Sequence, residues 1–192
     1  MSFYSIRHFI EQYYPEYYTW EKYPADECVT IHKTTDAWGV LSNFARTPLL
    51  VKGIQFKCAE QLFQLMKFKE PEAIKAVYAA GNPKMTAKHW ERTCRRDDWG
   101  MMILDAMKFV LQEKYDQCEG FRLALERSRG RYIVEDQTSF PKKTPDTWGT
   151  KLHDDVFEGP NLLGRLLMEL RDKGSLTFQL SEDTFDFVRF LP

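Results

Sequence analysis

The sequence has 192 residues, a length typical of one domain and sufficient to bury a hydrophobic core without disulfide or metal support. Hydrophobic residues make up 43% of the chain and charged residues 29%, with 27 basic against 28 acidic side chains. This balance argues against a disordered chain and against a strongly basic nucleic-acid-binding surface. No apolar run approaches the roughly 20 residues that cross a bilayer, so we expect no membrane anchor.

The cysteines and histidines are scattered along the chain. The N-terminus lacks the basic region and apolar core of a secretory signal, so we expect reduced thiols in a cytoplasmic protein. No histidine or cysteine cluster has the spacing that zinc needs, and we expect neither a metal nor a cofactor. The residues concerned are Cys28, Cys58, Cys94, Cys118, His8, His32, His89 and His153.

The predicted elements begin with an amphipathic helix that ends before Pro15. Its apolar stripe favours packing on the body of the protein over ligand binding, and consists of Phe3, Ile6, Phe9, Ile10 and Tyr13.

Apart from a β-prone run at 28–31, residues 23–35 are predicted to be irregular. Residues 36–44 mix Gly, Ser and Asn with large apolar side chains and are predicted to form a binding loop.

A hairpin is predicted where two short β-prone runs, Leu49–Val51 and Ile54–Phe56, flank Lys52 and Gly53. A helix follows over 58–68. A second helix begins at Pro71 and ends near Ala80, before the sequence Gly-Asn-Pro.

The clearest helix signal starts at Trp99, where Asp97 or Asp98 provides a cap and apolar residues recur at helical spacing. A short helix over 119–127 and a β-prone run at 132–135 follow. After Pro160, leucine pairs predict a helix that Lys173 and Gly174 close, and 176–180 reads as a final strand or extended tail. The pattern predicts an α+β fold, a helix-dominated single domain with a few short strands.

On the helix after the hairpin, Glu60, Gln64 and Lys67 occupy positions i, i+4 and i+7 and are predicted to share one stripe. Spacing alone favours a solvated polar face. A functional interpretation gains from the company of Phe56 and Phe63, which lie beside the stripe.

Further candidate residues lie in loops and at helix ends. Asp146 precedes Trp148 and Gly149, a combination that serves equally well as a buried turn anchor or as a base-stacking site. Asn161 opens the last helix, where a simple cap is favoured over a phosphate site. Arg96, with Arg92 and Arg95, forms a basic cluster near Trp99 that is more typical of a solvated surface than of a phosphate site.

Taken together, these segments resemble the NADAR (NAD and ADP-ribose) family, also described as YbiA-like N-glycosidases. The resemblance runs from Trp38 to Gly174 and rests on motifs in a fixed order. The motifs are Leu41-Ser42-Asn43-Phe44, then Gly53, then the run from Ala59 to Phe68, then Arg96-Asp97-Asp98-Trp99, then Val134-Glu135, Asp146-Thr147-Trp148-Gly149 and Asn161-Leu162-Leu163-Gly164. Where the family form has His and Tyr after the glutamate, this chain has Gln61 and Leu62.

The resemblance implies a YbiA-like fold over residues 36–174, with an N-terminal extension at 1–35 and a C-terminal tail at 175–192. It implies an N-glycosyl hydrolase of the EC 3.2.2 type, acting on ribosylamino-pyrimidine phosphates of the riboflavin pathway or on ADP-ribosylated guanine, and hence a link to NAD metabolism. Nucleic acid would be a partner only as an ADP-ribosylated substrate.

The resemblance also implies roles for individual residues. Glu60 would act near the sugar or in proton transfer, Lys67 would form a Schiff base, and Asp146 would orient a hydroxyl or water. The expected substrate-binding residues are Asn43, Phe44, Gln64, Arg96, Trp99, Trp148, Gly149, Asn161 and Gly164. Two other classes stay open: a non-catalytic module that binds ADP-ribose or a related NAD-derived nucleotide, and a structural or interaction role for the N-terminal helix and the C-terminal tail.

Overall fold

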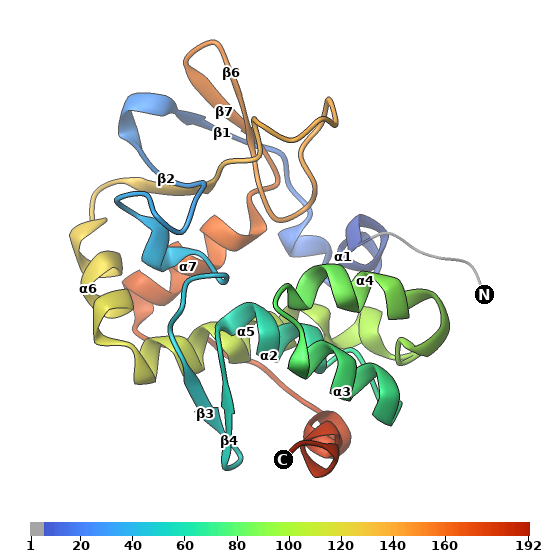
Figure 1. The fold of residues 1–192 in the computed structure, drawn as a ribbon. Coiled ribbons are helices and arrows are strands. Elements are labelled where there is room, and N and C mark those ends of the chain that lie inside the picture. The colour runs from blue at the N-terminus through green and yellow to red at the C-terminus, as the bar shows by residue number, and fades with distance from the viewer. Residues whose placement is uncertain (1–5) are drawn as a thin grey trace. The chain divides into compact units, whose positions relative to one another are not determined.

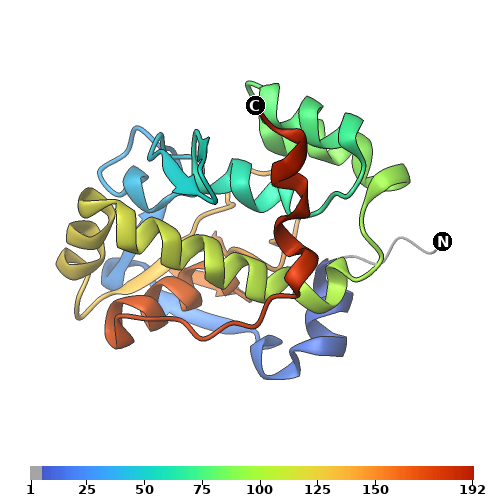
Figure 2. The same ribbon diagram turned by 90° about the horizontal axis from the view of Figure 1, so that it is seen from below.

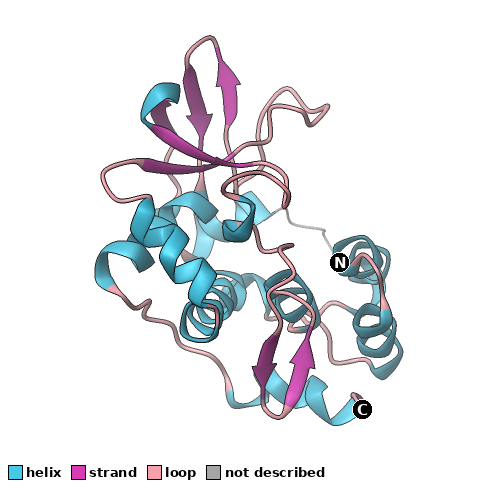
Figure 3. Ribbon diagram, turned by 60° about the vertical axis from the view of Figure 1, so that its left-hand side comes forward, coloured by secondary structure: helices cyan, strands magenta, loops and turns pink. Residues whose placement is uncertain are grey.

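A computed structural model describes residues 6–192, and the predicted helix residue Phe3 lies outside this range. The α+β class is confirmed, since helices dominate and the strands are short (Figure 3). The fold consists of two compact units that interleave along the chain. The first contains Asn43–Gln117 and Thr177–Pro192, and the second contains residues 6–42 and Cys118–Leu176. The division into 1–35, 36–174 and 175–192 stays a prediction.

In the first unit the predicted hairpin is confirmed as the antiparallel strands β3 (Leu49–Val51) and β4 (Ile54–Phe56). Lys52 and Gly53 have φ values of 51° and 80°. Positive φ at both central residues is the geometry of a tight two-residue hairpin turn, which explains why glycine is needed at the second position. The hairpin leads the chain directly into the first buried helix.

That helix, α2 (Ala59–Leu65), is buried along its whole length. It lies among α3 (Pro71–Ala79), α4 (Pro83–Cys94) and α5 (Trp99–Gln117) (Figure 1). Helix α4 was not predicted, because the sequence at Pro83 reads as the end of α3. In the structure the side chain of Asn82 accepts a hydrogen bond from the Met85 amide, and Pro83 occupies the first turn. The same two residues therefore start a new helix.

The C-terminal segment belongs to the first unit. Residues 176–180 form no strand, and the chain continues into a 3₁₀ helix, η4 (Glu182–Phe190), that crosses α5 (Figure 2). The ring centroids of Phe185 and Phe109 are 5.0 Å apart, and those of Phe187 and Phe56 are 6.1 Å apart. The tail is thus bound to this unit by aromatic contacts.

In the second unit, the β-prone runs are confirmed as the parallel pair β2 (Cys28–Ile31) and β5 (Tyr132–Glu135). Helix α7 (Leu162–Lys173) packs on β5, and α6 (Glu119–Arg127) packs on α7. Gly174, with φ of 74°, ends α7 as predicted. The N-terminal helix α1 covers Ile6–Tyr13, and its Phe9 and Ile10 are buried.

A three-stranded antiparallel sheet in this unit was not predicted. Its order is β1 (Glu21–Pro24), β7 (Val156–Gly159), β6 (Lys151–His153). These strands are three or four residues long, too short for alternation to be visible, and β1 pairs with a strand more than 100 residues away. The first pair of residues in this pairing is Glu21 with Gly159. Within residues 6–192 no helix is long and apolar enough to cross a membrane.

Candidate active site

A buried carboxylate and a buried amide lie one turn apart on α2. Gln64 Nε2 donates a 2.7 Å hydrogen bond to Glu60 Oε1, and both side chains are at most 5% exposed. The Glu60 backbone amide donates to the Asn43 carbonyl at 2.9 Å, which joins the predicted binding loop to the start of the helix. A solvated polar face, which spacing alone favoured, is therefore wrong for these two residues.

Lys67 is buried near this pair but is not part of the helix, because α2 ends at Leu65. The prediction of three residues on one helical stripe is therefore wrong for Lys67. Its ammonium group forms an ion pair with Glu91 of α4 and lies 5.8 Å and 5.7 Å from the ring centroids of Phe63 and Trp99. Burial lowers the pKa of the Lys67 amine, while the charges of Glu91 and, more weakly, Glu60 oppose that shift.

Two buried acceptors in the first unit have no hydrogen-bond partner among the described residues. They are Asn43 Oδ1 and Gln64 Oε1, on side chains that are 4% and 3% exposed. The amide nitrogen of Asn43 contacts Met107 Sδ at 3.2 Å, and that of Gln64 is used by Glu60. An unpaired buried acceptor costs about 1–3 kcal/mol, so such atoms point to a ligand that supplies the missing donors.

The other predicted residues of this unit differ in exposure. Trp99 is buried against Phe63, with ring centroids 5.3 Å apart, whereas Phe44 is 40% exposed. Arg96 is buried, and its guanidinium binds the carboxylates of Asp98 and Asp183, so the solvated cluster favoured from sequence is wrong for this residue. Asp98 uses its carboxylate for this contact. Because two acids already occupy Arg96, a direct phosphate contact from it would require their displacement.

The second unit holds Asp146 at its surface in a fixed position. Asp146 Oδ1 accepts hydrogen bonds from Gln137 Nε2 at 2.6 Å and from the Trp148 amide at 2.9 Å. Gln137 Oε1 in turn accepts from the Asp146 backbone amide at 2.8 Å. These contacts orient the carboxylate while leaving the residue exposed to solvent.

At two glycines of the second unit, Gly149 and Gly164, neighbouring atoms lie so close that no side chain fits. A Cβ atom at Gly149 would lie 2.6 Å from the Gln137 side chain, and one at Gly164 would lie 2.0 Å from the Ile133 carbonyl oxygen. Asn161 is fully buried, donates to the Ile133 carbonyl at 2.8 Å and accepts from the Glu135 amide at 3.1 Å. Its side chain makes no helix cap, so the simple cap favoured from sequence is wrong.

The predicted residues thus divide into one group in the first unit and another in the second. The first group is Asn43, Phe44, Glu60, Gln64, Lys67, Arg96 and Trp99, and the second is Asp146, Trp148, Gly149, Asn161 and Gly164. Sequence reasoning missed Glu91 and Gln137. A prediction of α4 from the Asn82-Pro83 start signal would have drawn attention to Glu91, whereas no local signal marks Gln137. Residues 6–192 contain no cluster of three or more metal-ligating side chains.

The sequence and the α+β fold agree with one known class of proteins. The family model of the NADAR domain matches residues 30–173, and the chain belongs to this family. It is similar to the N-glycosidase YbiA of Escherichia coli strain K12, with 27% identity over 150 residues that cover 77% of this chain and 89% of the relative. The N-glycosidase YbiA of Shigella flexneri has the same identity and coverage.

The solved structures give the same result. The NMR structure of the E. coli protein YbiA has a TM-score of 0.62 to this chain at 28% identity. The alignment covers 77% of this chain and 84% of the YbiA chain.

Proposed function

We propose that the protein is an N-glycosidase that hydrolyses the bond between ribose and a nitrogen base. The proposal is carried by the buried pair Glu60–Gln64 near the buried Lys67, which forms an ion pair with the half-buried Glu91, and is supported by the curated relatives named N-glycosidases. The proposed substrates are ribosylamino-pyrimidine phosphates or ADP-ribose joined to guanine. Both carry a ribose whose anomeric carbon is bonded to nitrogen.

Glu60 suits the sugar side of this reaction. Cleavage of an N-glycosidic bond develops positive charge at the anomeric carbon, and a carboxylate in a water-poor site stabilises that charge more strongly than one in solvent. The hydrogen bond from Gln64 fixes the carboxylate in place. The unpaired oxygens of Asn43 and Gln64 would accept hydrogen bonds from ribose hydroxyls.

Lys67 and Glu91 suit a covalent route. A ribosylamine opens to an imine, and the neutral Lys67 amine adds to that carbon, expels the base as its free amine and forms a lysine imine in its place. Water then adds to the lysine imine and releases ribose and the lysine amine. Glu91 would accept the proton that the Lys67 ammonium loses before attack, and burial of Lys67 favours that loss.

In the second unit, we assign Asp146 to orienting a hydroxyl or water and Trp148 to stacking on a planar group. The support for Asp146 is its fixed and exposed carboxylate. The support for Trp148 is its position in the same loop, with its backbone bonded to that carboxylate.

The test measures, by chromatography, the release of the base from two substrates. These are a ribosylamino-pyrimidine phosphate and an ADP-ribosylated guanine oligonucleotide. We expect release by the wild type, loss of at least about 100-fold in Glu60→Gln and Lys67→Ala, and no change in Glu72→Gln, which alters an exposed carboxylate of the same unit. Full activity of folded Glu60→Gln and Lys67→Ala would overturn the proposal. Borohydride added during turnover would trap sugar on the wild type but not on Lys67→Ala if the imine forms.

A second candidate function is binding of ADP-ribose without turnover. The unpaired acceptors Asn43 Oδ1 and Gln64 Oε1 favour it, because they need only a bound ligand and no reaction. Calorimetry with ADP-ribose, and chromatography after long incubation with the two ribosylated substrates, separates the candidates. Tight binding with unaltered substrates would favour the binding module.

A further inference from the structure

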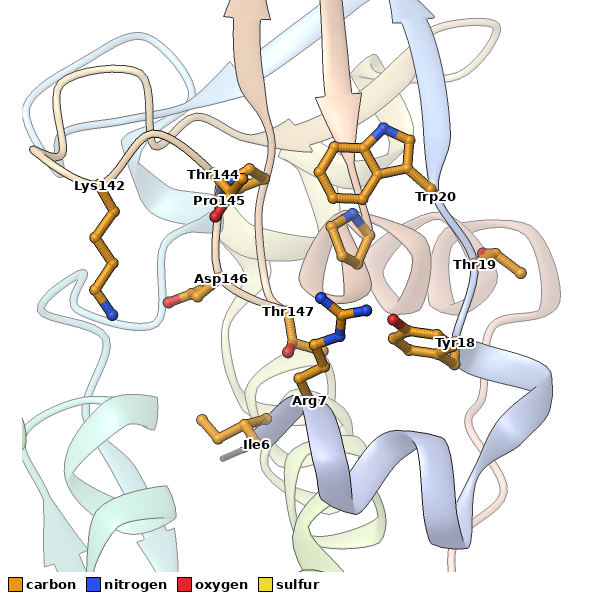
Figure 4. A pocket seen from close by; sticks show the side chains of 11 residues that line it. Ile6, Arg7, Tyr18, Thr19, Trp20, Lys142, Thr144, Pro145, Asp146 and Thr147 are labelled. Carbon is orange, nitrogen blue, oxygen red and sulfur yellow. The ribbon is translucent and has the colours of Figure 1, made fainter. Parts of the chain in front are cut away.

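A cavity of about 480 Å³ lies in the second unit, between the N-terminal segment and the loop that carries Asp146 (Figure 4). Its N-terminal wall includes Arg7, Tyr18 and Trp20, which precede the NADAR match at residue 30. The volume falls in the range of roughly 300–1,000 Å³ typical of small-molecule sites. The cavity is therefore a candidate binding site to which residues outside the family region contribute.

The cavity offers flat apolar surfaces. Trp20 is 53% exposed although it lines the cavity, and Pro145 and Pro160 contribute apolar rings. A half-exposed tryptophan at a concave site is available for stacking on a planar ring, and such stacking tolerates any base. In Figure 4 the indole of Trp20 and the ring of Tyr18 lie on one side of the space, and the side chain of Asp146, on the other side, points away from them.

The cavity also carries positive charge. Arg7 is held by a 3.2 Å hydrogen bond from Nε to Glu11 and lies over the Tyr18 ring. Figure 4 shows its guanidinium end directed into the space, with Lys142 on the far side. The Glu11 contact uses Nε of Arg7, unlike the two acids that occupy Arg96, so the terminal nitrogens of Arg7 can still donate to a phosphate.

The cavity also has hydroxyl groups and one acid in its lining. Thr144 and Thr147 line the cavity, and so does the fixed carboxylate of Asp146. A carboxylate beside hydroxyl groups accepts hydrogen bonds from sugar hydroxyls, whereas it would repel a phosphate placed against it. The anionic part of a ligand is therefore expected near Arg7 and away from Asp146.

We propose that this cavity binds a nucleoside 5′-phosphate, with the base on Trp20 and the phosphate at Arg7. A base alone would leave Arg7 unused, and a sugar phosphate alone would leave Trp20 unused. The site makes Arg7 and Trp20 determinants of ligand choice in this chain. It does not depend on the proposed hydrolysis.

The test is calorimetry with adenosine 5′-monophosphate (AMP), adenosine and ribose 5-phosphate as probes. We expect the wild type to bind AMP more tightly than either fragment, and Trp20→Ala to weaken AMP and adenosine by about tenfold. Arg7→Gln should weaken AMP by about tenfold and leave adenosine unchanged. The controls are Tyr13→Ala, an exposed aromatic on α1, and Arg129→Gln, an exposed arginine of the same unit that does not line the cavity.

The two controls should bind all probes like the wild type. Because Trp20 and Arg7 are mostly exposed, their variants should fold, and circular dichroism checks this. Equal AMP affinity in the wild type, Trp20→Ala and Arg7→Gln would overturn the site, as would no binding of AMP at millimolar concentration. A protein that binds AMP in this pattern but releases no base would keep the site and remove the proposed hydrolysis.

Discussion

The two units each hold a carboxylate fixed by a glutamine, in opposite environments. Gln64 donates to Glu60 at 2.7 Å in the first unit, and Gln137 donates to Asp146 at 2.6 Å in the second. Glu60 is buried near the ammonium group of Lys67, whereas Asp146 is exposed at the edge of a cavity. Under the proposed function, the same hydrogen bond would prepare one acid for stabilising charge and the other for orienting a ligand, because the surroundings set how strongly each carboxylate acts on a charge.

The largest effect that we expect concerns the backbone that supports Asp146. Gly164→Ala places a Cβ 2.0 Å from the Ile133 carbonyl oxygen, so helix α7 must shift away from β5. We expect a loss of about 3 kcal/mol in the free energy of unfolding, measured by urea denaturation. Gly120→Ala in α6 is the matched control, because nothing lies within 4 Å of its Cβ position. A loss below about 1 kcal/mol would show that the contact relaxes easily.

The matched pair Gln64→Leu and Gln137→Leu tests the comparison of the two acids. Gln64→Leu leaves a buried carboxylate without its donor, and we expect base release to fall about 30-fold. Gln137→Leu leaves Asp146 with the Trp148 amide and solvent, and we expect a fall of less than about fivefold. Equal losses would remove the distinction between a buried and an exposed acid.

The pH dependence of turnover tests Lys67. In the proposed covalent route its neutral amine is the reactive form, and burial lowers its pKa, so the rate should rise with pH through that lowered value and then level off. The charge of Glu91 raises this pKa, so Glu91→Gln should lower it further and move the rising limb to lower pH. A limb that stays in place, or moves to higher pH, would show that another group sets the profile.

The smallest expected effect concerns the C-terminal tail. Asp183 binds Lys69 at 2.6 Å and Arg96 at 2.9 Å, and these contacts lower the pKa of its carboxyl from 3.8. The stabilisation is present above the ordinary pKa and is lost as the pH falls through the lowered value. Because Asp183 is 38% exposed, we expect Asp183→Asn to cost less than about 1 kcal/mol at pH 7.

Urea unfolding of the wild type and Asp183→Asn at several pH values checks this prediction. The difference between the two proteins should shrink in acid, and a constant difference would contradict an ionic contact.

Sequence patterns predicted elements whose signals are local. The hairpin at Lys52-Gly53 depends on two residues with positive φ, and α5 depends on its own apolar spacing. Helix α4 was missed because Asn82-Pro83 ends one helix and starts the next. The sheet β1-β7-β6 was missed because strands of three or four residues pair across most of the chain.

In the candidate site, too, local features could be predicted from the sequence and long-range contacts could not. Periodicity placed Glu60 and Gln64 together, since both lie on α2, but could not show that their face is buried. The partner of Lys67 is Glu91, 24 residues away, and the partner of Asp146 is Gln137 on the far side of a loop. Such contacts depend on tertiary packing, which leaves no periodic trace in the sequence.

The most direct measurement is the turnover number for base release by Glu60→Gln and by Asp146→Asn, on the same ribosylated substrate and with unfolding midpoints recorded. If the buried acid stabilises developing charge, Glu60→Gln should lower the turnover number at least about 100-fold, whereas Asp146→Asn should act mainly on KM. A folded Glu60→Gln protein with an unchanged turnover number would contradict the assignment of the chemistry to this cluster.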